Sequence, residues 1–401
     1  MDITIRLATE DDFAEIARLD GAAFGITYTE QDVDDALRMV ELTRFYVATH
    51  DEEIIGSAGD LPLSMTVPGG SVDLPGVTWV SVSPVYRRRG VLRRLMERQL
   101  RDYADRGERM AILTASQGGI YRRFGYGAAT QVRKTSVDRR LARLQPDEPP
   151  VAEPVEYATA ERARQVLPEL HDRWRREVPG AVNRTTSWWD LFFTDRESQR
   201  AGMTARQFLL HPDGYVAYRI KPDWVDGRAH HLCVVTDYVW LSATAHRALW
   251  HILLGLDLVA AIESRQLAMD DPLPHLLNDP RQVQTTSIKD GVWVRPLDIA
   301  ATLSARTYPV EVEAVLEVVD PMLGNGRYAL RGGPDGADCA RTERGADVRL
   351  TVDALGSCYL GGQRLGALAA AGRVEVSDPR VLSRMDLAFL SGRAPFHGTD
   401  F

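Results

Sequence analysis

The chain has 401 residues, of which 44% are hydrophobic and 26% are charged. At roughly 150 residues per domain, this length indicates two or three globular domains, and the composition excludes a mainly disordered or coiled-coil protein. The net charge of -8 disfavours nucleic acid as a partner and is compatible with cationic small molecules. No apolar run reaches the roughly 18 residues of a membrane span.

The first part of the chain alternates strand and helix patterns. Period-two or continuous apolar runs, typical of strands, occur at 3–7, 45–49, 54–67, 77–82, 110–114 and 129–137. Apolar residues with helical spacing occur at 13–24 and 91–103. This order predicts a first domain over residues 1–144 in which helices pack on a sheet.

A proline-rich, acidic stretch at 145–154 predicts a linker, after which strand and helix patterns resume. Residues 237–258 repeat the order of residues 77–100, a strand followed by an amphipathic helix, without the arginine-rich loop between them. This is either a degenerate internal repeat or a chance similarity between two strand–helix units. We expect a second domain over residues 155–296.

The character of the sequence changes again near residue 299. Strand-like runs occur at 310–319, 327–330 and 346–352, and a helix of small residues follows at 365–371. This pattern predicts a third domain over residues 299–401 with helices on one sheet. The three cysteines, Cys233, Cys339 and Cys358, are far apart and odd in number, which predicts a reducing, cytoplasmic location.

The main chemical feature is the loop after the strand that ends at Val82. It contains Arg87, Arg88 and Arg89 and is followed by Gly90 and a helix. A helix start offers unpaired backbone N–H groups and the positive end of the helix dipole. With arginines and a glycine that allows close approach, this pattern favours a pyrophosphate site, although a solvated basic surface turn is the alternative. The loop is neither a Walker motif nor a dinucleotide fingerprint.

A second motif follows about 25 residues later, in which Tyr121 stands four residues before Gly125 and five before Tyr126. The combination R-x-x-G, helix, strand and Y-x-x-x-G-aromatic resembles the coenzyme A site of the GNAT superfamily of N-acetyltransferases. The stretches VSVSPVYRRRGVLRRL and ASQGGIYRRFGYG resemble the enhanced-intracellular-survival (Eis) family. The resemblance implies an α+β chain with two tandem GNAT-like domains, the second degenerate, and a C-terminal sterol-carrier-protein-like domain. It also implies a homohexamer.

The resemblance assigns roles to individual residues. Tyr121 is expected to protonate the leaving thiolate, and the terminal carboxylate of Phe401 to receive the amine proton. Phe24 and Trp79 either line the acceptor cavity or belong to the core, and Asp400 either adds charge to the acceptor site or is an exposed tail acid. The residues implied to bind acetyl-CoA are Val80, Ser81, Val82, Arg88, Arg89, Gly90, Val91, Leu92, Arg93, Ser116 and Gln117.

The implied activity is transfer of acetyl from acetyl-CoA to several amines of cationic small molecules such as aminoglycosides. A tyrosine of pKa about 10 is a poor match for a thiol of pKa about 8.5 unless a helix N-terminus or an arginine lowers it. The alternative is a lipid or acyl carrier with a vestigial transferase, which residues 355–374 favour and the intact loop from Arg88 to Gly90 disfavours. We expect no metal, because His230 and His231 on one strand would point to opposite faces.

Overall fold

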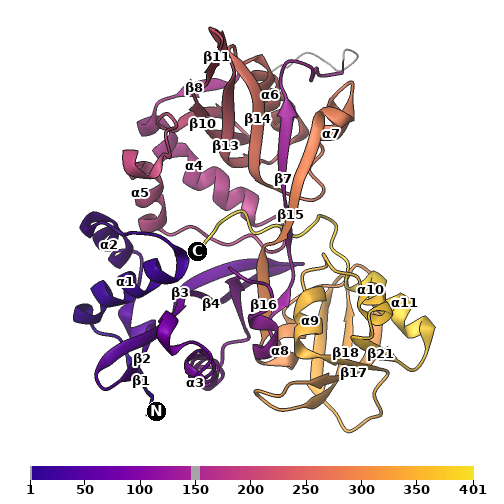
Figure 1. The fold of residues 1–401 in the computed structure, drawn as a ribbon. Helices are drawn as coiled ribbons and strands as arrows, with labels where there is room; N and C mark the ends of the chain where they lie inside the picture. Colours follow the sequence, from indigo (N-terminus) through magenta and orange to yellow (C-terminus); the bar gives the residue numbers. More distant parts are fainter. Residues whose placement is uncertain (1, 146–153) are drawn as a thin grey trace. The chain divides into compact units, whose positions relative to one another are not determined.

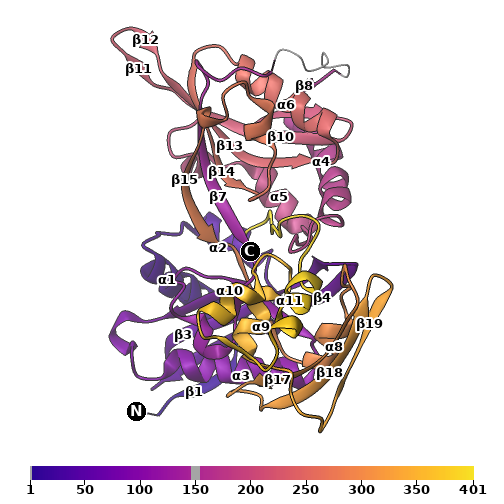
Figure 2. The same ribbon diagram turned by 90° about the vertical axis from the view of Figure 1, so that its right-hand side faces the viewer.

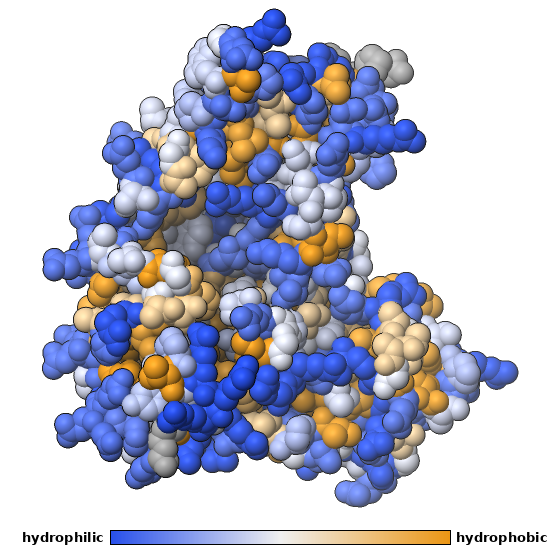
Figure 3. Space-filling view, viewed as in Figure 1, coloured by the Kyte–Doolittle hydropathy of each residue, from blue (hydrophilic) through white to orange (hydrophobic). Residues whose placement is uncertain are grey.

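The structure is a computed structural model that describes residues 2–145 and 154–401. It forms two compact units, one that combines Met1–Thr130 with Asp290–Phe401 and one that comprises Gln131–Lys289 (Figure 1). Most of the predicted linker, 146–153, lies outside the described residues. Among the described residues no helix is both long enough and apolar enough to cross a bilayer. The face in Figure 3 is mostly hydrophilic, with apolar residues scattered over it.

The first unit contains a seven-stranded sheet in the order β1-β2-β3-β4-β5-β16-β6. Its strands are β1 (Thr4–Leu7), β2 (Tyr46–His50), β3 (Glu53–Val67), β4 (Gly70–Val82), β5 (Met110–Thr114), β6 (Gly127–Ala128) and β16 (Val292–Pro296). The helices packed with it are α1 (Phe13–Phe24), α2 (Glu30–Leu37) and α3 (Val91–Asp105), with short 3-10 turns at Glu10–Asp12, Leu42–Arg44, Pro84–Tyr86 (η3) and Tyr121–Phe124 (η4).

Helix α3 shows how the pattern produces the packing. Val91, Leu95, Met96 and Leu100 recur at helical spacing and are all at most 1% exposed, because that spacing places them on one face. The strand before it is longer than predicted. β4 starts at Gly70 and forms a hairpin with β3, since the expected turn at 68–70 joins two long strands directly.

The second unit contains another seven-stranded sheet, in the order β15-β7-β14-β13-β10-β9-β8. Its strands are β7 (Gln131–Asp138), β8 (Glu156–Ala158), β9 (Gln207–His211), β10 (Gly214–Lys221), β13 (His231–Trp240), β14 (Val259–Leu267) and β15 (Val283–Asp290). Its remaining elements are α4 (Ala160–Arg175), α5 (Thr186–Thr194), α6 (Ala243–Gly255), α7 (Leu273–Leu276), the hairpin β11 (Trp224–Val225) and β12 (Arg228–Ala229), and 3-10 turns at Glu197–Gln199 and Pro280–Gln282.

The two sheets exchange one strand each. β7 follows the first domain in the chain but pairs with β14 in the second sheet, and β16 follows the second domain but pairs with β5 in the first. The expected limits at 144 and 296 therefore do not coincide with sheet membership. An alternating run specifies a strand and its buried face, but it does not specify which partner strand it joins, so this exchange was not predictable from periodicity.

The C-terminal domain belongs to the first unit and has a five-stranded sheet in the order β19-β18-β17-β20-β21. The strands are β17 (Val312–Val319), β18 (Gly326–Gly333), β19 (Gly336–Arg341), β20 (Val348–Thr351) and β21 (Val374–Val376). The helices are α8 (Ile299–Ser304), α9 (Val352–Cys358), α10 (Leu365–Ala370) and α11 (Pro379–Ala388). α9 and α11 pack on β17 and α8 packs on β18 and β19 (Figure 2). Helices on one sheet were predicted; β19, β21, α8 and α11 were not.

Candidate active site

A bulge in β4 opens the first sheet. Ser57 of β3 pairs with Ser81 and Gly59 pairs with Thr78, so Trp79 and Val80 face a single residue of β3. Trp79 has a φ of +53°, and the Ser57 hydroxyl donates to its carbonyl over 2.9 Å. Within the described strands, pairing of β4 with β5 stops at Val77. A bulge bends the strand that carries it, and beyond this point β4 diverges from β5.

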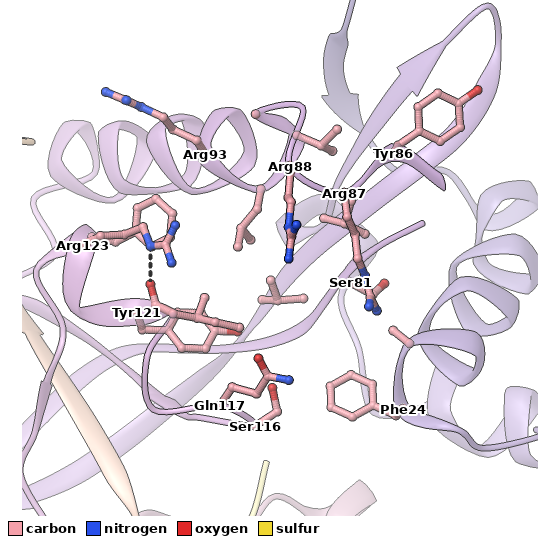
Figure 4. Close-up of a pocket in the computed structure, with 18 residues that line it drawn as sticks. Phe24, Ser81, Tyr86, Arg87, Arg88, Arg93, Ser116, Gln117, Tyr121 and Arg123 are labelled. Carbon is pink, nitrogen blue, oxygen red and sulfur yellow. Dashed lines mark hydrogen bonds between the residues drawn. The ribbon is translucent and has the colours of Figure 1, made fainter. Parts of the chain in front are cut away.

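The divergence leaves a cavity of about 660 Å³ at the start of α3, a size typical of ligand sites. Its walls come from the end of β4, the loop before α3, the segment after β5 and η4, with Ala23 and Phe24 of α1 at one edge. All predicted cofactor residues except Arg89 line it. Figure 4 shows Arg88 directed into the cavity, with Tyr121, Ser116 and Gln117 on the opposite side.

The first turn of α3 has no side-chain cap. Its N-cap is Gly90 with a φ of +85°, a conformation that glycine adopts without strain, and no side chain accepts from the N–H groups of that turn. Among the described residues, neither Arg87 nor Arg88 forms an ion pair, and both line the cavity. Uncapped N–H groups beside unpaired guanidinium groups form a site for an anion such as pyrophosphate.

The other two arginines of the predicted set are placed differently. The guanidinium of Arg89 lies 5.6 Å from the centroid of the Tyr86 ring and outside the cavity lining. Arg93 lines the cavity, but its Nε donates to Glu97 over 2.7 Å and Figure 4 shows its side chain directed away from the centre. The guanidinium group of Arg93 is therefore paired outside the cavity, and Arg93 contributes to the cavity wall mainly through its backbone.

Tyr121 begins η4 and is 6% exposed. Its ring packs edge-on against Tyr126, with 6.1 Å between the ring centroids, and both belong to a core cluster with Phe124 and Trp293. Burial raises the pKa of Tyr121 to about 12. The sequence suggested that a helix end or an arginine could lower this pKa; the structure shows the opposite shift, because the apolar surroundings disfavour the phenolate.

The C-terminal residues return to the β4–β5 pair. The Phe401 ring lies so close to Gly76 that a Cβ there would be 3.0 Å from it, and Gly76 is one of the two β4 residues that pair with β5. Asp400 is 69% exposed and its carboxylate lies 3.4 Å from Nε2 of His397. His397 is 1% exposed, and it was not singled out in the sequence.

Of the two aromatic residues predicted either to line the acceptor cavity or to belong to the core, one lines the cavity and the other packs against neighbouring rings. Phe24 lines the cavity and is 48% exposed. Trp79 packs on Phe13 and Tyr28, with ring centroids 5.3 and 5.9 Å apart, and is not part of the lining. The orientation of Trp79 follows from its position in the bulge, which single-strand periodicity does not reveal.

Several lining residues were missed in the sequence. Tyr86, Ile120, Arg123 and Phe124 all border the cavity and lie inside or beside the two motifs, so the motifs themselves could have indicated them. Trp293 of β16 packs behind Tyr121 from a distant part of the chain, and no local signal marked it. In the residues described, no three His, Cys, Asp or Glu side chains are grouped as ligands for a metal.

The second unit has a corresponding strand and helix, β13 and α6, but the end of this strand and the start of this helix are occupied by side chains. β13 pairs with β14 from His231 to Val235, and beyond that point it pairs with β10 alone. Beyond that point Tyr238, His246 and Trp250 pack together, with ring centroids of Tyr238 5.6 and 6.1 Å from the other two. The first turn of α6 is capped by Ser242, whose hydroxyl accepts from the Ala245 N–H over 3.2 Å.

A sheet whose central parallel strands diverge over an uncapped helix start is the arrangement of an acyl-CoA-type transferase. Family models support this class. A model described as an acetyltransferase (GNAT) domain matches residues 4–129, a second one matches residues 180–296, and a sterol carrier protein domain matches residues 299–398. The predicted α+β plan of two GNAT domains and a sterol-carrier-like domain is thus confirmed, and the internal repeat is a second domain of the same family.

Similarity to individual proteins is more specific. The chain is 38% identical to N-acetyltransferase Eis of Mycobacterium tuberculosis over 404 residues, which covers 98% of both chains. It is 38% identical to an uncharacterized N-acetyltransferase of Streptomyces avermitilis over 86% of both chains. The crystal structure of Eis1 from Mycobacterium abscessus superposes with a TM-score of 0.89 at 35% identity and full coverage of both chains. The chain belongs to the Eis family and is an N-acetyltransferase.

Proposed function

We propose that the protein transfers acetyl from acetyl-CoA to amines of cationic small molecules such as aminoglycosides, at more than one position of each acceptor. The observation that carries the proposal is the cavity in which the uncapped start of α3 and the unpaired Arg88 stand opposite Tyr121. It offers an anion site for the cofactor and a proton donor for its thiol in one space.

The walls of the cavity suit the parts of acetyl-CoA. The N–H groups of Val91 and Leu92 and the guanidinium groups of Arg87 and Arg88 can bind the pyrophosphate. The backbone of Val80, beyond the last residue that pairs with β5, can bind the amide groups of the pantetheine arm. Ser116 and Gln117 add polar groups on the facing wall.

In the reaction a neutral amine attacks the acetyl carbonyl, and the carbon–sulfur bond breaks as the new carbon–nitrogen bond forms. The sulfur receives a proton from the Tyr121 hydroxyl, and the terminal carboxylate of Phe401 receives the amine proton directly or through a water. With the pKa of Tyr121 raised to about 12, the hydroxyl first donates a hydrogen bond to the developing thiolate. Proton transfer then follows as negative charge accumulates on the sulfur.

The proposed acceptor preference rests on acidic residues of α2, which follows the cavity-lining Phe24 in the chain, and of the chain end. Helix α2 carries the exposed acids Glu30 and Asp34, and Asp400 adds an exposed carboxylate beside Phe401. Carboxylates attract ammonium groups, and several of them suit an acceptor with several amines. Phe24 would pack against the apolar surface of such an acceptor.

The proposal includes a cytoplasmic location, where acetyl-CoA is available, and assembly into homohexamers; light scattering on the purified protein tests the latter. The three cysteines are free and buried, which suits a reducing compartment. We favour the transferase over a lipid carrier with a vestigial transferase, because the first-domain cavity carries unpaired arginines and an uncapped helix start.

Thiol release from acetyl-CoA, measured with a panel of aminoglycosides and with spermidine, tests this function. We expect turnover with aminoglycosides and mass increments of several acetyl groups. Turnover confined to acceptors with a single uncharged amine would contradict the acceptor class, and the absence of thiol release with every amine would contradict the activity on small molecules.

A further inference from the structure

The turn that carries Tyr121 has two faces. Tyr121, Phe124 and Tyr126 point into the core of the first domain and are all at most 6% exposed. Arg122 and Gly125, which lie between these residues, and Gly127, which follows Tyr126, face the C-terminal domain. Residues of this turn therefore contact two domains in alternation, the core of the first domain and the C-terminal domain.

The first contact is an ion pair at the neighbour of Tyr121. Arg122 Nε donates to the carboxylate of Asp353 over 2.8 Å, and Arg373 donates to the same carboxylate. The Asp353 side chain is 8% exposed, and these two arginines form its ion pairs. Asp353 lies in the first turn of α9, and Arg373 lies just before β21.

The second contact is steric. At Gly127 a Cβ would lie 1.9 Å from the carbonyl oxygen of Asp353 and 2.5 Å from the backbone nitrogen of Ser357. A Cβ does not occur at such distances from backbone atoms, so α9 and the end of the turn can be this close only because residue 127 is glycine. The backbone of the turn therefore rests directly on α9.

The third contact lies under Gly125, which ends η4 with a φ of +85°. A Cβ there would be 2.6 Å from Nε of Arg295. Arg295 is fully buried and donates to both carboxylate oxygens of Asp320 over 2.8 and 3.0 Å. Asp320 follows β17, and its carboxylate also accepts from the Met322 N–H over 3.0 Å. The C-terminal domain thus fixes the orientation of the guanidinium beneath the turn.

From these contacts we propose that the sterol-carrier-like domain acts as a clamp that positions the proton donor, with Asp353 and Asp320 as positioning residues for Tyr121. Neither carboxylate touches the cofactor cavity. They act through Arg122 and Arg295, which fix the position and orientation of the turn at residues 121–127, the Tyr121 turn, relative to β4 and β5. The inference rests on the proposed role of Tyr121.

The clamp predicts a specific kinetic effect. Misplacement of a reacting group by about 1 Å can lower the rate as much as a hundredfold, and we expect Asp353→Asn to lower kcat about tenfold. The KM for acetyl-CoA should stay within about twofold, because the start of α3 and Arg88 are untouched. Asp320→Asn should act in the same direction.

A matched control lies in the same domain. Glu317 of β17 is also a carboxylate shared by two arginines, Arg327 at 3.0 Å and Arg349 at 3.2 Å. It has no contact with the Tyr121 turn among the described residues. Glu317→Gln removes a similar pair of bonds and should leave kcat unchanged. Thermal denaturation of all variants reports any loss of folding separately from the kinetics.

A double-mutant cycle with Tyr121→Phe separates positioning from general damage. If Asp353 acts through Tyr121, Asp353→Asn costs nothing further once the hydroxyl is gone. Multiplicative losses in the double variant, or a kcat for Asp353→Asn equal to that of Glu317→Gln, would overturn the clamp. Full activity of Tyr121→Phe alone would instead overturn the proposed role of Tyr121, so the two failures are distinguishable.

Discussion

The two transferase-like sheets differ most at one helix start. In the first sheet α3 begins at Gly90 without a side-chain cap, and arginines without ion-pair partners border the space above it. In the second sheet α6 begins at Ser242, which caps its own helix, and aromatic rings pack where the strands diverge. Both sheets retain the divergence. The divergence is therefore common to both sheets, whereas the uncapped helix start on which the proposed cofactor site depends occurs at α3 and not at α6.

The largest expected contrast concerns two tyrosines, the buried Tyr121 and the half-buried Tyr238. Tyr121→Phe should lower kcat a hundredfold or more, because general acid catalysis contributes about 10²–10⁴-fold. Tyr238→Phe should leave kcat unchanged, since its hydroxyl is buried in the second unit. Thiol release under saturating acetyl-CoA measures both. Equal losses in the two variants would remove the functional distinction between the sheets.

The next effect concerns the chain end, whose carboxylate is the proposed proton acceptor beside the first sheet. Two glycines added after Phe401 convert its carboxylate into a peptide bond, and we expect kcat to fall at least about tenfold. The same two residues added before Met1 are the control. Unchanged turnover of the C-terminally extended protein would show that the amine proton leaves by another route.

Substitutions in the arginine loop should act on cofactor binding. Arg88→Gln removes a cavity-lining charge, and the loss of about 1.5–3 kcal/mol for a charge-assisted bond predicts an acetyl-CoA affinity lower by at least about tenfold. Arg89→Gln should change affinity less than about threefold, because its guanidinium lies over Tyr86. Calorimetric titration with coenzyme A distinguishes the two. A larger effect at Arg89 would reassign the phosphate contact.

A smaller effect is expected in the pH profile. Because burial raises the pKa of Tyr121 to about 12, the hydroxyl keeps its proton while the acceptor amine loses its own. The rate should therefore rise with pH as the amine becomes neutral and then change less than about twofold up to about pH 10. A decline that begins near pH 8 would be inconsistent with a buried, protonated tyrosine.

The smallest effect on turnover is expected in the second sheet. Trp250→Ala removes a side chain that is 1% exposed and should cost about 3–5 kcal/mol of stability. Turnover per folded molecule should stay unchanged, since the cavity belongs to the first unit. Urea titration and thiol release measure the two quantities, and a large loss of kcat in the folded variant would reveal a dependence of the first sheet on the second.

The sequence predicted the parts of the site that are local. A phosphate site made of consecutive backbone N–H groups must appear as a short motif, so Arg88 and Gly90 were recognisable, and Tyr121 was assigned from the family resemblance of its own motif. Trp293, Arg295 and Asp353 were not, because they approach the turn from more than 150 residues further along the chain. Trp79 was ambiguous because its direction depends on a bulge that only the pairing with β3 reveals.

The exchange of β7 and β16 between the two sheets limits which segments of the chain can be deleted. Removal of residues 131–296 would delete β16 from the middle of the first sheet, between β5 and β6. Removal of residues 1–138 would likewise take β7 from between β14 and β15. Each half therefore carries a piece of the other's framework. Neither sheet is complete without residues from the other half of the chain, and neither half can be removed without opening the remaining sheet.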